Sequence, residues 1–167
     1  MRFSGERQVG APVAQVWTAL HDSEVLRSTI PGCEELVPLD ADRYAATLAA
    51  RVGPVRDTYR GTFSSLDVHP GSEILVRVAG SGRCGRLDVD LRVTLTTGTR
   101  AGTTALRYDA EAAVTGFVAH LGAAALTVAG SHFTSCFFRD LDRSLRASTP
   151  RVGLPVTAYA ATPVSSR

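Results

Sequence analysis

Strict alternation of apolar and polar residues over consecutive segments is the feature that most constrains the fold of this chain. Apolar residues occupy every second position from Leu87 to Leu95 and again from Leu106 to Val114. Shorter segments between residues 44 and 78 repeat the pattern. Because strand side chains point alternately to the two faces of a sheet, the pattern predicts an antiparallel sheet with one buried face. Leu66 and Val68 fall on the opposite parity, which predicts a bulge just before them.

Helical periodicity is confined to three segments. Residues 3–9 are expected to form a first strand, after which Pro12 opens a helix with apolar residues at helical spacing. Asp22 or Ser23 can cap a second short helix that ends before Pro31-Gly32. A long C-terminal helix is predicted over residues 117–145. Together with the strands, these helices predict the α+β class.

Composition restricts the class of protein. A hydrophobic fraction of 44% is typical of a globular chain, and a net charge of +2 carried by scattered arginines argues against a nucleic-acid partner. The three cysteines are widely spaced, which favours neither a zinc ribbon nor a disulfide framework and fits a reducing compartment. No basic-then-apolar leader precedes the first strand. The expected location is cytoplasmic, with peripheral contact at the inner membrane face.

No catalytic or metal-binding set is predicted. The segment Gly80–Gly85 matches G-x-G-x-x-G, but a strand follows it where a phosphate loop needs a helix, so a mobile turn is expected. The four histidines share no metal-ligand spacing, and Asp57 is the only acidic residue expected on an inner strand face. Only His120 is expected to face the interior, either as a core or rim histidine bonded to backbone or as a ligand contact. Neither a cofactor nor a metal is expected.

Several short motifs carry a resemblance to a known family. They are Phe-Ser-Gly-Glu at 3–6, Ala-Pro-x-x-x-Val-Trp at 11–17, Ile-Pro-Gly-Cys-Glu at 30–34 and Val-Gly-Pro-Val at 52–55. Their order and spacing resemble the carbon monoxide dehydrogenase CoxG-like family of the START/polyketide-cyclase (SRPBCC) superfamily. The resemblance implies a helix-grip fold, with a curved antiparallel sheet of about seven strands around a long C-terminal helix and two short helices after strand 1. It also implies one ligand-binding domain over residues 1–147, and residues 148–167 are expected to form a flexible tail.

An apolar cavity with few polar groups is expected between the sheet and the long helix. Small residues on the helix, Ala119, Ala123 and Gly130, would leave volume there. The alternative is a solid core filled by aromatic residues from the strands. The expected ligand-binding residues are Trp17, Ile30, Tyr44, Tyr59, Phe63, Val78, Tyr108, His120, Ala123, Thr127 and Thr134. The resemblance implies that the glycine-rich turn overhangs the cavity as a gate, with gate residues Gly80, Gly82 and Gly85.

The expected function is binding of a lipophilic small molecule, with a prenylated quinone as the candidate ligand. The resemblance implies service to a molybdenum carbon monoxide dehydrogenase-like enzyme and its membrane association. The alternative is a polyketide cyclase/aromatase-like enzyme acting on a bound apolar chain, and a third reading is a docking protein with a collapsed cavity. The lack of an inward acid–base pair favours binding over catalysis.

Two features bear on the membrane and on the ligand. Leu121, Ala125 and Val128 are expected to form an apolar patch beside Phe117, near arginines further along the helix, which suits weak docking on an anionic bilayer or on a partner enzyme. The alternative is that the short helices or the tail cover the patch. Arg7 lies in the inner-face phase, where the family presents an apolar residue. It is expected either to reach the rim or to face the cavity and bind an acidic ligand.

Overall fold

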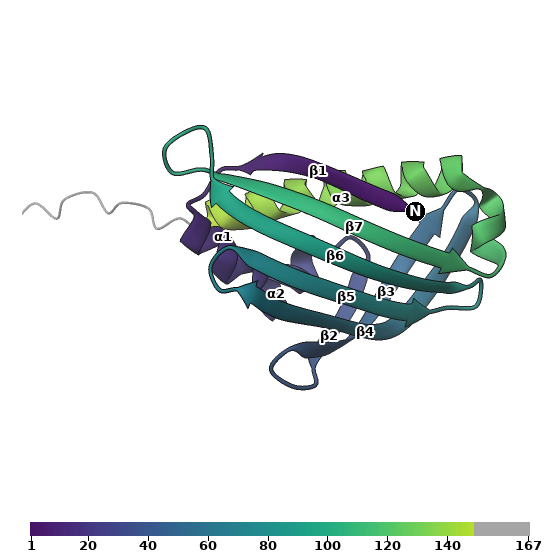
Figure 1. Cartoon of the computed structure of the whole chain (residues 1–167). Coiled ribbons are helices and arrows are strands. Elements are labelled where there is room, and N and C mark those ends of the chain that lie inside the picture. The colour runs from purple at the N-terminus through teal and green to yellow at the C-terminus, as the bar shows by residue number, and fades with distance from the viewer. Residues whose placement is uncertain (149–167) are drawn as a thin grey trace, which may run out of the picture.

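A single antiparallel sheet curls around one long helix in the computed structural model, which describes residues 1–148 (Figure 1). The strands are β1 (Arg2–Val9), β2 (Cys33–Pro38), β3 (Arg43–Val52), β4 (Val55–His69), β5 (Glu73–Ser81), β6 (Arg86–Thr97) and β7 (Thr104–Thr115). The helices are α1 (Val13–Leu20), α2 (Ser23–Thr29), the 3-10 helix η1 (Phe117–Leu121) and α3 (Ala123–Ala147). The predicted helix-grip fold is confirmed. The tail expected over residues 148–167 lies, apart from Ser148, outside the described residues.

The first strand, β1, forms one edge of the sheet and pairs with the last strand, β7. The strand order is β1-β7-β6-β5-β4-β3-β2, so α1 and α2 carry the chain from one edge of the sheet to the other. Asp22 caps α2, because its Oδ1 accepts hydrogen bonds from the backbone N–H groups of Glu24 and Val25. The two short helices cover one end of the sheet, while η1 and the β5–β6 turn lie at the other end (Figure 1).

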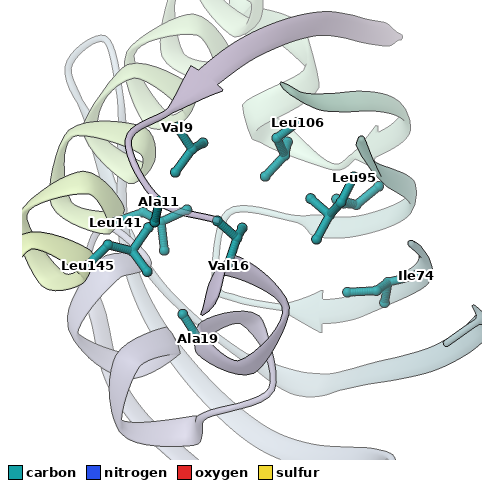
Figure 2. Packing of buried hydrophobic residues seen from close by; sticks show 10 residues of the cluster. Val9, Ala11, Val16, Ala19, Ile74, Leu95, Leu106, Leu141 and Leu145 are labelled. Carbon is teal, nitrogen blue, oxygen red and sulfur yellow. The ribbon is translucent and has the colours of Figure 1, made fainter. Parts of the chain in front are cut away.

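The fully buried core occupies the end of the molecule beside α1. Val16 and Leu141 are each 0% exposed, and they pack with strand residues from β1, β5, β6 and β7. Figure 2 shows these side chains converging from α1, the second half of α3 and the strand ends. The core cluster is Val9, Ala11, Val16, Ala19, Ile74, Val93, Leu95, Leu106, Leu141 and Leu145.

The expectation of one continuous helix over residues 117–145 is wrong. Gly116 and Gly122 adopt φ angles of 84° and 86°, a left-handed region that favours glycine, and they bracket the short helix η1. The expected bulge near residues 64–65 is also wrong, since β4 keeps its register with β5 as far as Asp67 and shifts only between Asp67 and His69. Leu66 therefore faces outward and is 57% exposed.

Candidate functional site

The inner face of the sheet changes character beyond the core. Strand register places Tyr44, Phe63 and Val78 side by side on β3, β4 and β5, and the first two rings meet edge to face at 5.9 Å. All three are only half-buried, whereas Tyr59, further along β4, is 9% exposed. An apolar inner face that stays half-buried is not fully covered by other side chains. We call this partly covered stretch of the inner face, formed by Tyr44, Tyr59, Phe63 and Val78, the inner hollow.

Small residues lie at one level of the inner face. Ala46 pairs with Gly61, and Gly61 pairs with Gly80, so a strip of minimal side chains crosses β3, β4 and β5 at one level. The expectation that Gly130 of α3 leaves free volume is wrong, because Phe3 fills that space. A Cβ atom added at Gly130 would lie 2.5 Å from the Phe3 ring.

Tyrosine hydroxyls provide the polar groups of this apolar face. The hydroxyls of Tyr44, Tyr59 and Tyr108 form no hydrogen bond with any group in residues 1–148. Tyr108 lies 5.8 Å from the Phe138 ring, at the border between the hollow and the core. Burial raises the pKa of the Tyr59 phenol, and the nearby Asp57 carboxylate raises it further. The Tyr59 phenol therefore stays protonated and free to donate one hydrogen bond.

The other residues expected to bind ligand are dispersed. Trp17 packs against the core cluster and stacks on His21 with ring centroids 4.5 Å apart. Ile30 is half-buried at the C-terminal cap of α2. Thr134 is half-buried, and its hydroxyl donates to the Gly130 carbonyl oxygen at 2.9 Å. Of these three, Trp17 belongs to the filled end of the interior.

The residues expected from the start of the long helix are exposed. Ala123 and Thr127 lie on the helical phase that continues to Leu141, but no part of residues 1–148 covers these two positions in the first turns of α3. His120 lies before the break at Gly122, so the helical phase that assigned it to the interior does not apply. It is exposed, and its Nδ1 lies 3.1 Å from the Gly116 carbonyl oxygen.

The glycine-rich turn is anchored to neighbouring elements. The Cys84 N–H donates to Asp57 Oδ2 at 2.7 Å, and the Thr58 N–H donates to Asp57 Oδ1 at 2.8 Å. The Val118 N–H donates to the Cys84 carbonyl oxygen at 3.0 Å, which joins the turn to η1. The strand β6 begins directly after the turn, as expected, so the turn lacks the helix that a phosphate loop requires. Its role as a gate stays a prediction.

Asp57 should control how tightly this turn is held. The hydrogen bond from the Cys84 N–H holds the pKa of the Asp57 carboxyl below its ordinary value. Since the folded pKa is lowered, the contribution to stability is present above the unfolded pKa of about 3.9 and is lost as pH falls through the folded value. Asp57→Asn should therefore speed hydrogen exchange of the Cys84 amide at pH 7. The variant should also lose the acid-dependent fall in protection that wild type shows.

Hydrogen–deuterium exchange followed by NMR from pH 3 to 7 measures this effect, with amides of β7 as an internal control. Unchanged protection of the Cys84 amide in Asp57→Asn would show that the carboxylate does not hold the turn.

A second carboxylate on the inner face of the sheet was not predicted from the sequence. Asp67 lies on the inner phase of β4, and its Oδ1 lies 2.7 Å from His21 Nε2. The other ring nitrogen of His21 lies 2.8 Å from the Trp17 carbonyl oxygen. Both ring nitrogens of His21 are therefore engaged with oxygen atoms of the protein. Uninterrupted alternation from Tyr59 through Phe63 is the signal that would have found Asp67.

Arg7 reaches the rim of the sheet. It shares the inner-face phase of β1 with Val9, but its side chain is exposed. Its guanidinium carbon lies 5.7 Å from the centroid of the Phe138 ring, within the range of a cation–π interaction. Arg7 was expected either at the rim or facing the cavity, and the structure places it at the rim.

The apolar patch at the start of the helix is smaller than expected. Phe117 and Val128 are 63% and 70% exposed, while Leu121 and Ala125 are half-buried. Arg139 and Arg143 both pair with Asp140, which offsets part of their charge. No helix in residues 1–148 is both long and apolar enough to cross a bilayer. The same residues hold no cluster of three or more side chains suited to binding a metal ion.

Comparisons with known proteins agree with this architecture. The family model of CoxG, a carbon monoxide dehydrogenase subunit, matches residues 5–146. A conserved protein from Geobacillus kaustophilus has a TM-score of 0.83 at 26% identity, covering 89% of this chain and 97% of that one. A START superfamily protein from Mycobacterium smegmatis has a TM-score of 0.69 at 10% identity, covering 87% and 97% of the two chains.

The Zhui aromatase/cyclase from Streptomyces sp. R1128 has a TM-score of 0.67 at 13% identity, covering 87% of this chain and 93% of that one. At such low identity, the aromatase/cyclase and the mycobacterial protein show only that their fold is the same as that of this chain. No curated protein matches the chain. The family match covers most of the chain and coincides with the helix-grip fold, so the chain belongs to the carbon monoxide dehydrogenase CoxG family.

Proposed function

We propose that this protein binds a lipophilic small molecule in the inner hollow. The observation that carries the proposal is a nine-tenths buried tyrosine, Tyr59, whose hydroxyl has no protein partner within residues 1–148. No side-chain oxygen in these residues is both fully enclosed and unbonded, so this hydroxyl opens to the hollow, where a ligand or water can bond it. A prenylated quinone fits this chemistry, because its carbonyl oxygens accept hydrogen bonds and its chain needs an apolar surface.

Blocking the hollow should abolish ligand uptake. Ala46 faces the hollow beside Gly61, so a phenylalanine there would fill the space, whereas Ala45 points to the other face of the same strand. Ubiquinone-2 is the test ligand, detected by native mass spectrometry and by organic extraction of the purified protein. We expect Ala46→Phe to lose the bound quinone and the control Ala45→Phe to retain it.

A second variant separates polar recognition from simple apolar uptake. Tyr59→Phe removes only the hydroxyl, so quinone affinity should fall about fivefold, as expected for one hydrogen bond worth about 1 kcal/mol. Affinity for an alkane of similar length should not change. Equal quinone binding by wild type, Ala46→Phe and Tyr59→Phe would contradict a site in the hollow.

The interactions that the inward-facing carboxylates already make favour binding over cyclase-type catalysis. Asp57 bonds the amides of the glycine-rich turn, and Asp67 faces His21. General acid–base catalysis needs a group free to exchange a proton with the substrate, and these carboxylates are already engaged. The tyrosine hydroxyls are suited to orienting a ligand.

The family description supports service to a carbon monoxide dehydrogenase. We propose that this enzyme is of the molybdenum type and that peripheral membrane contact is part of the service. We propose that Phe117 and Val128 make this contact, since they are the most exposed large apolar residues near the start of α3. The Val118 N–H is bonded to the glycine-rich turn, so Phe117 lies next to that turn. Contact of Phe117 with lipid would therefore bring the entrance of the hollow close to the bilayer. A lipophilic ligand could then pass between bilayer and protein without crossing water.

Co-sedimentation with anionic vesicles tests the membrane contact. A Phe117→Asp, Val128→Asp variant should sediment less than wild type, because two exposed apolar side chains no longer enter the interface. Leu66→Asp is the matched control, since Leu66 is 57% exposed on the outer face of the sheet. If wild type stays in the supernatant at low salt, or if all variants sediment alike, this contact is wrong.

A further inference from the structure

Arginines on the outer face of the sheet are neutralised except in one region. Across most of that face each arginine meets a carboxylate on the same or the neighbouring strand. These pairs are Arg2–Asp109, Arg77–Asp90, Arg86–Asp88, Arg92–Glu73 and Arg107–Glu6. Four arginines at the β3–β4 hairpin and the β5–β6 turn instead have no carboxylate partner in residues 1–148. They are Arg51, Arg56, Arg60 and Arg83.

These four arginines line one groove. Its volume is about 610 Å³, and Ala49 and Thr58 lie among the residues that line it. Arg51 and Arg56 are directly paired across the hairpin, an arrangement of like charges that destabilises a sheet unless an anion offsets it. The acidic residue in the lining, Asp57, is engaged by the amides of Thr58 and Cys84. We call this surface the arginine groove.

We propose that the arginine groove is a docking surface for an acidic segment of a partner protein. Guanidinium groups bind carboxylates through two parallel hydrogen bonds, so a row of four suits a chain of aspartate and glutamate side chains. Carboxylates bound in the groove would also offset the repulsion between the paired Arg51 and Arg56. The inference does not depend on the proposed ligand, because Arg51, Arg56 and Arg60 lie on the face of the sheet opposite the hollow.

A protein segment fits this groove better than a bilayer does. A membrane surface site combines basic residues with apolar side chains that enter the lipid. The apolar residues lining the groove are alanines, Ala49 and Ala50. The exposed Phe117 and Val128 belong to η1 and α3, and α3 lies on the other side of the sheet (Figure 1). A concave surface also matches an extended peptide more closely than a flat bilayer.

The test uses a short fluorescein-labelled peptide rich in aspartate and glutamate, with its asparagine and glutamine counterpart as the neutral probe. Fluorescence anisotropy measures binding to the full chain. One variant replaces all four groove arginines with glutamine. The matched control variant carries the same change in net charge at paired arginines of the same face, through Arg2→Gln, Arg77→Gln, Arg86→Gln and Arg107→Gln.

We expect wild type to bind the acidic peptide and not the neutral one. The groove variant should lose at least about tenfold in affinity and the control variant less than about threefold, because only close charge pairs contribute strongly. Binding should weaken as salt is raised, since these pairs lie at the surface. Circular dichroism of both variants checks folding, and a single Arg60→Gln substitution should give a partial loss.

Three results would overturn the proposal. Wild type that fails to bind the acidic peptide at low salt has no such docking surface. Equal losses in the groove and control variants would show that net charge alone is responsible. Anionic vesicles or a DNA duplex that bind wild type more tightly than the peptide, and lose this binding only in the groove variant, would assign the groove to another kind of partner.

Discussion

Replacing Gly61 with alanine should destabilise the protein by about 3 kcal/mol or more. A Cβ atom at Gly61 would lie 1.9 Å from the Ala79 carbonyl oxygen and 2.6 Å from the Gly80 Cα. Both are backbone atoms of the adjacent strand, so no side chain can rotate to make room. The strands β4 and β5 would have to separate at this position, and their hydrogen bonds would be disrupted there. Urea denaturation followed by circular dichroism measures the change in the free energy of unfolding.

The paired glycine supplies the control. Gly80 lies directly opposite Gly61, but a Cβ atom there would meet its nearest neighbour at 3.7 Å, an ordinary van der Waals contact. Gly80→Ala should therefore leave stability unchanged or raise it by up to about 1 kcal/mol, because alanine restricts the unfolded chain more than glycine does. If both substitutions have the same effect, close approach of the strands is not what requires glycine at position 61.

Leu141→Ala should cost about 2–5 kcal/mol of unfolding free energy. Leu141 is 0% exposed, and it belongs to the cluster in which α3, α1 and the strand ends meet. Removing its side chain leaves a cavity, and three elements would have to move to fill it. The loss should therefore lie in the upper part of this range. For a domain of this size the melting temperature should fall by roughly 10 °C.

Leu66→Ala is the matched comparison for this loss. Leu66 is 57% exposed on the outer face of β4, so its truncation should change stability by no more than about 0.5 kcal/mol. Thermal unfolding of the two variants beside wild type gives both values. Comparable losses would mean that the filled end of the interior is not the main source of stability.

Alternation in the sequence predicted the sheet because burial of one face imposes a period of two on the residues themselves. The inner faces of β6 and β7 follow the pattern from Leu87 to Leu95 and from Leu106 to Val114. The parity of Leu66 was misread for a physical reason. Exposed leucine is common on protein surfaces, so an apolar residue out of phase does not require a bulge.

The long helix was harder to predict than the strands. A single glycine such as Gly122 is tolerated within a helical sequence, and its positive φ angle is what separates η1 from α3. The assignment of His120 to the interior depended on that continuous helix. The register places Tyr44, Phe63 and Val78 side by side, with Tyr59 further along the same face of β4, because strand direction and parity determine position across a sheet. Their role in binding a ligand stays a prediction.

The separation of the filled core from the inner hollow has an evolutionary consequence. Residues that hold the fold, such as Val16 and Leu141, lie at the α1 end, whereas Tyr44, Phe63 and Val78 contribute little to that cluster. A protein near its stability threshold can accept new side chains only where they cost little. Proteins that share this scaffold should therefore differ first in the residues of the hollow, and so in the ligand that they bind, while the residues at the α1 end stay the same.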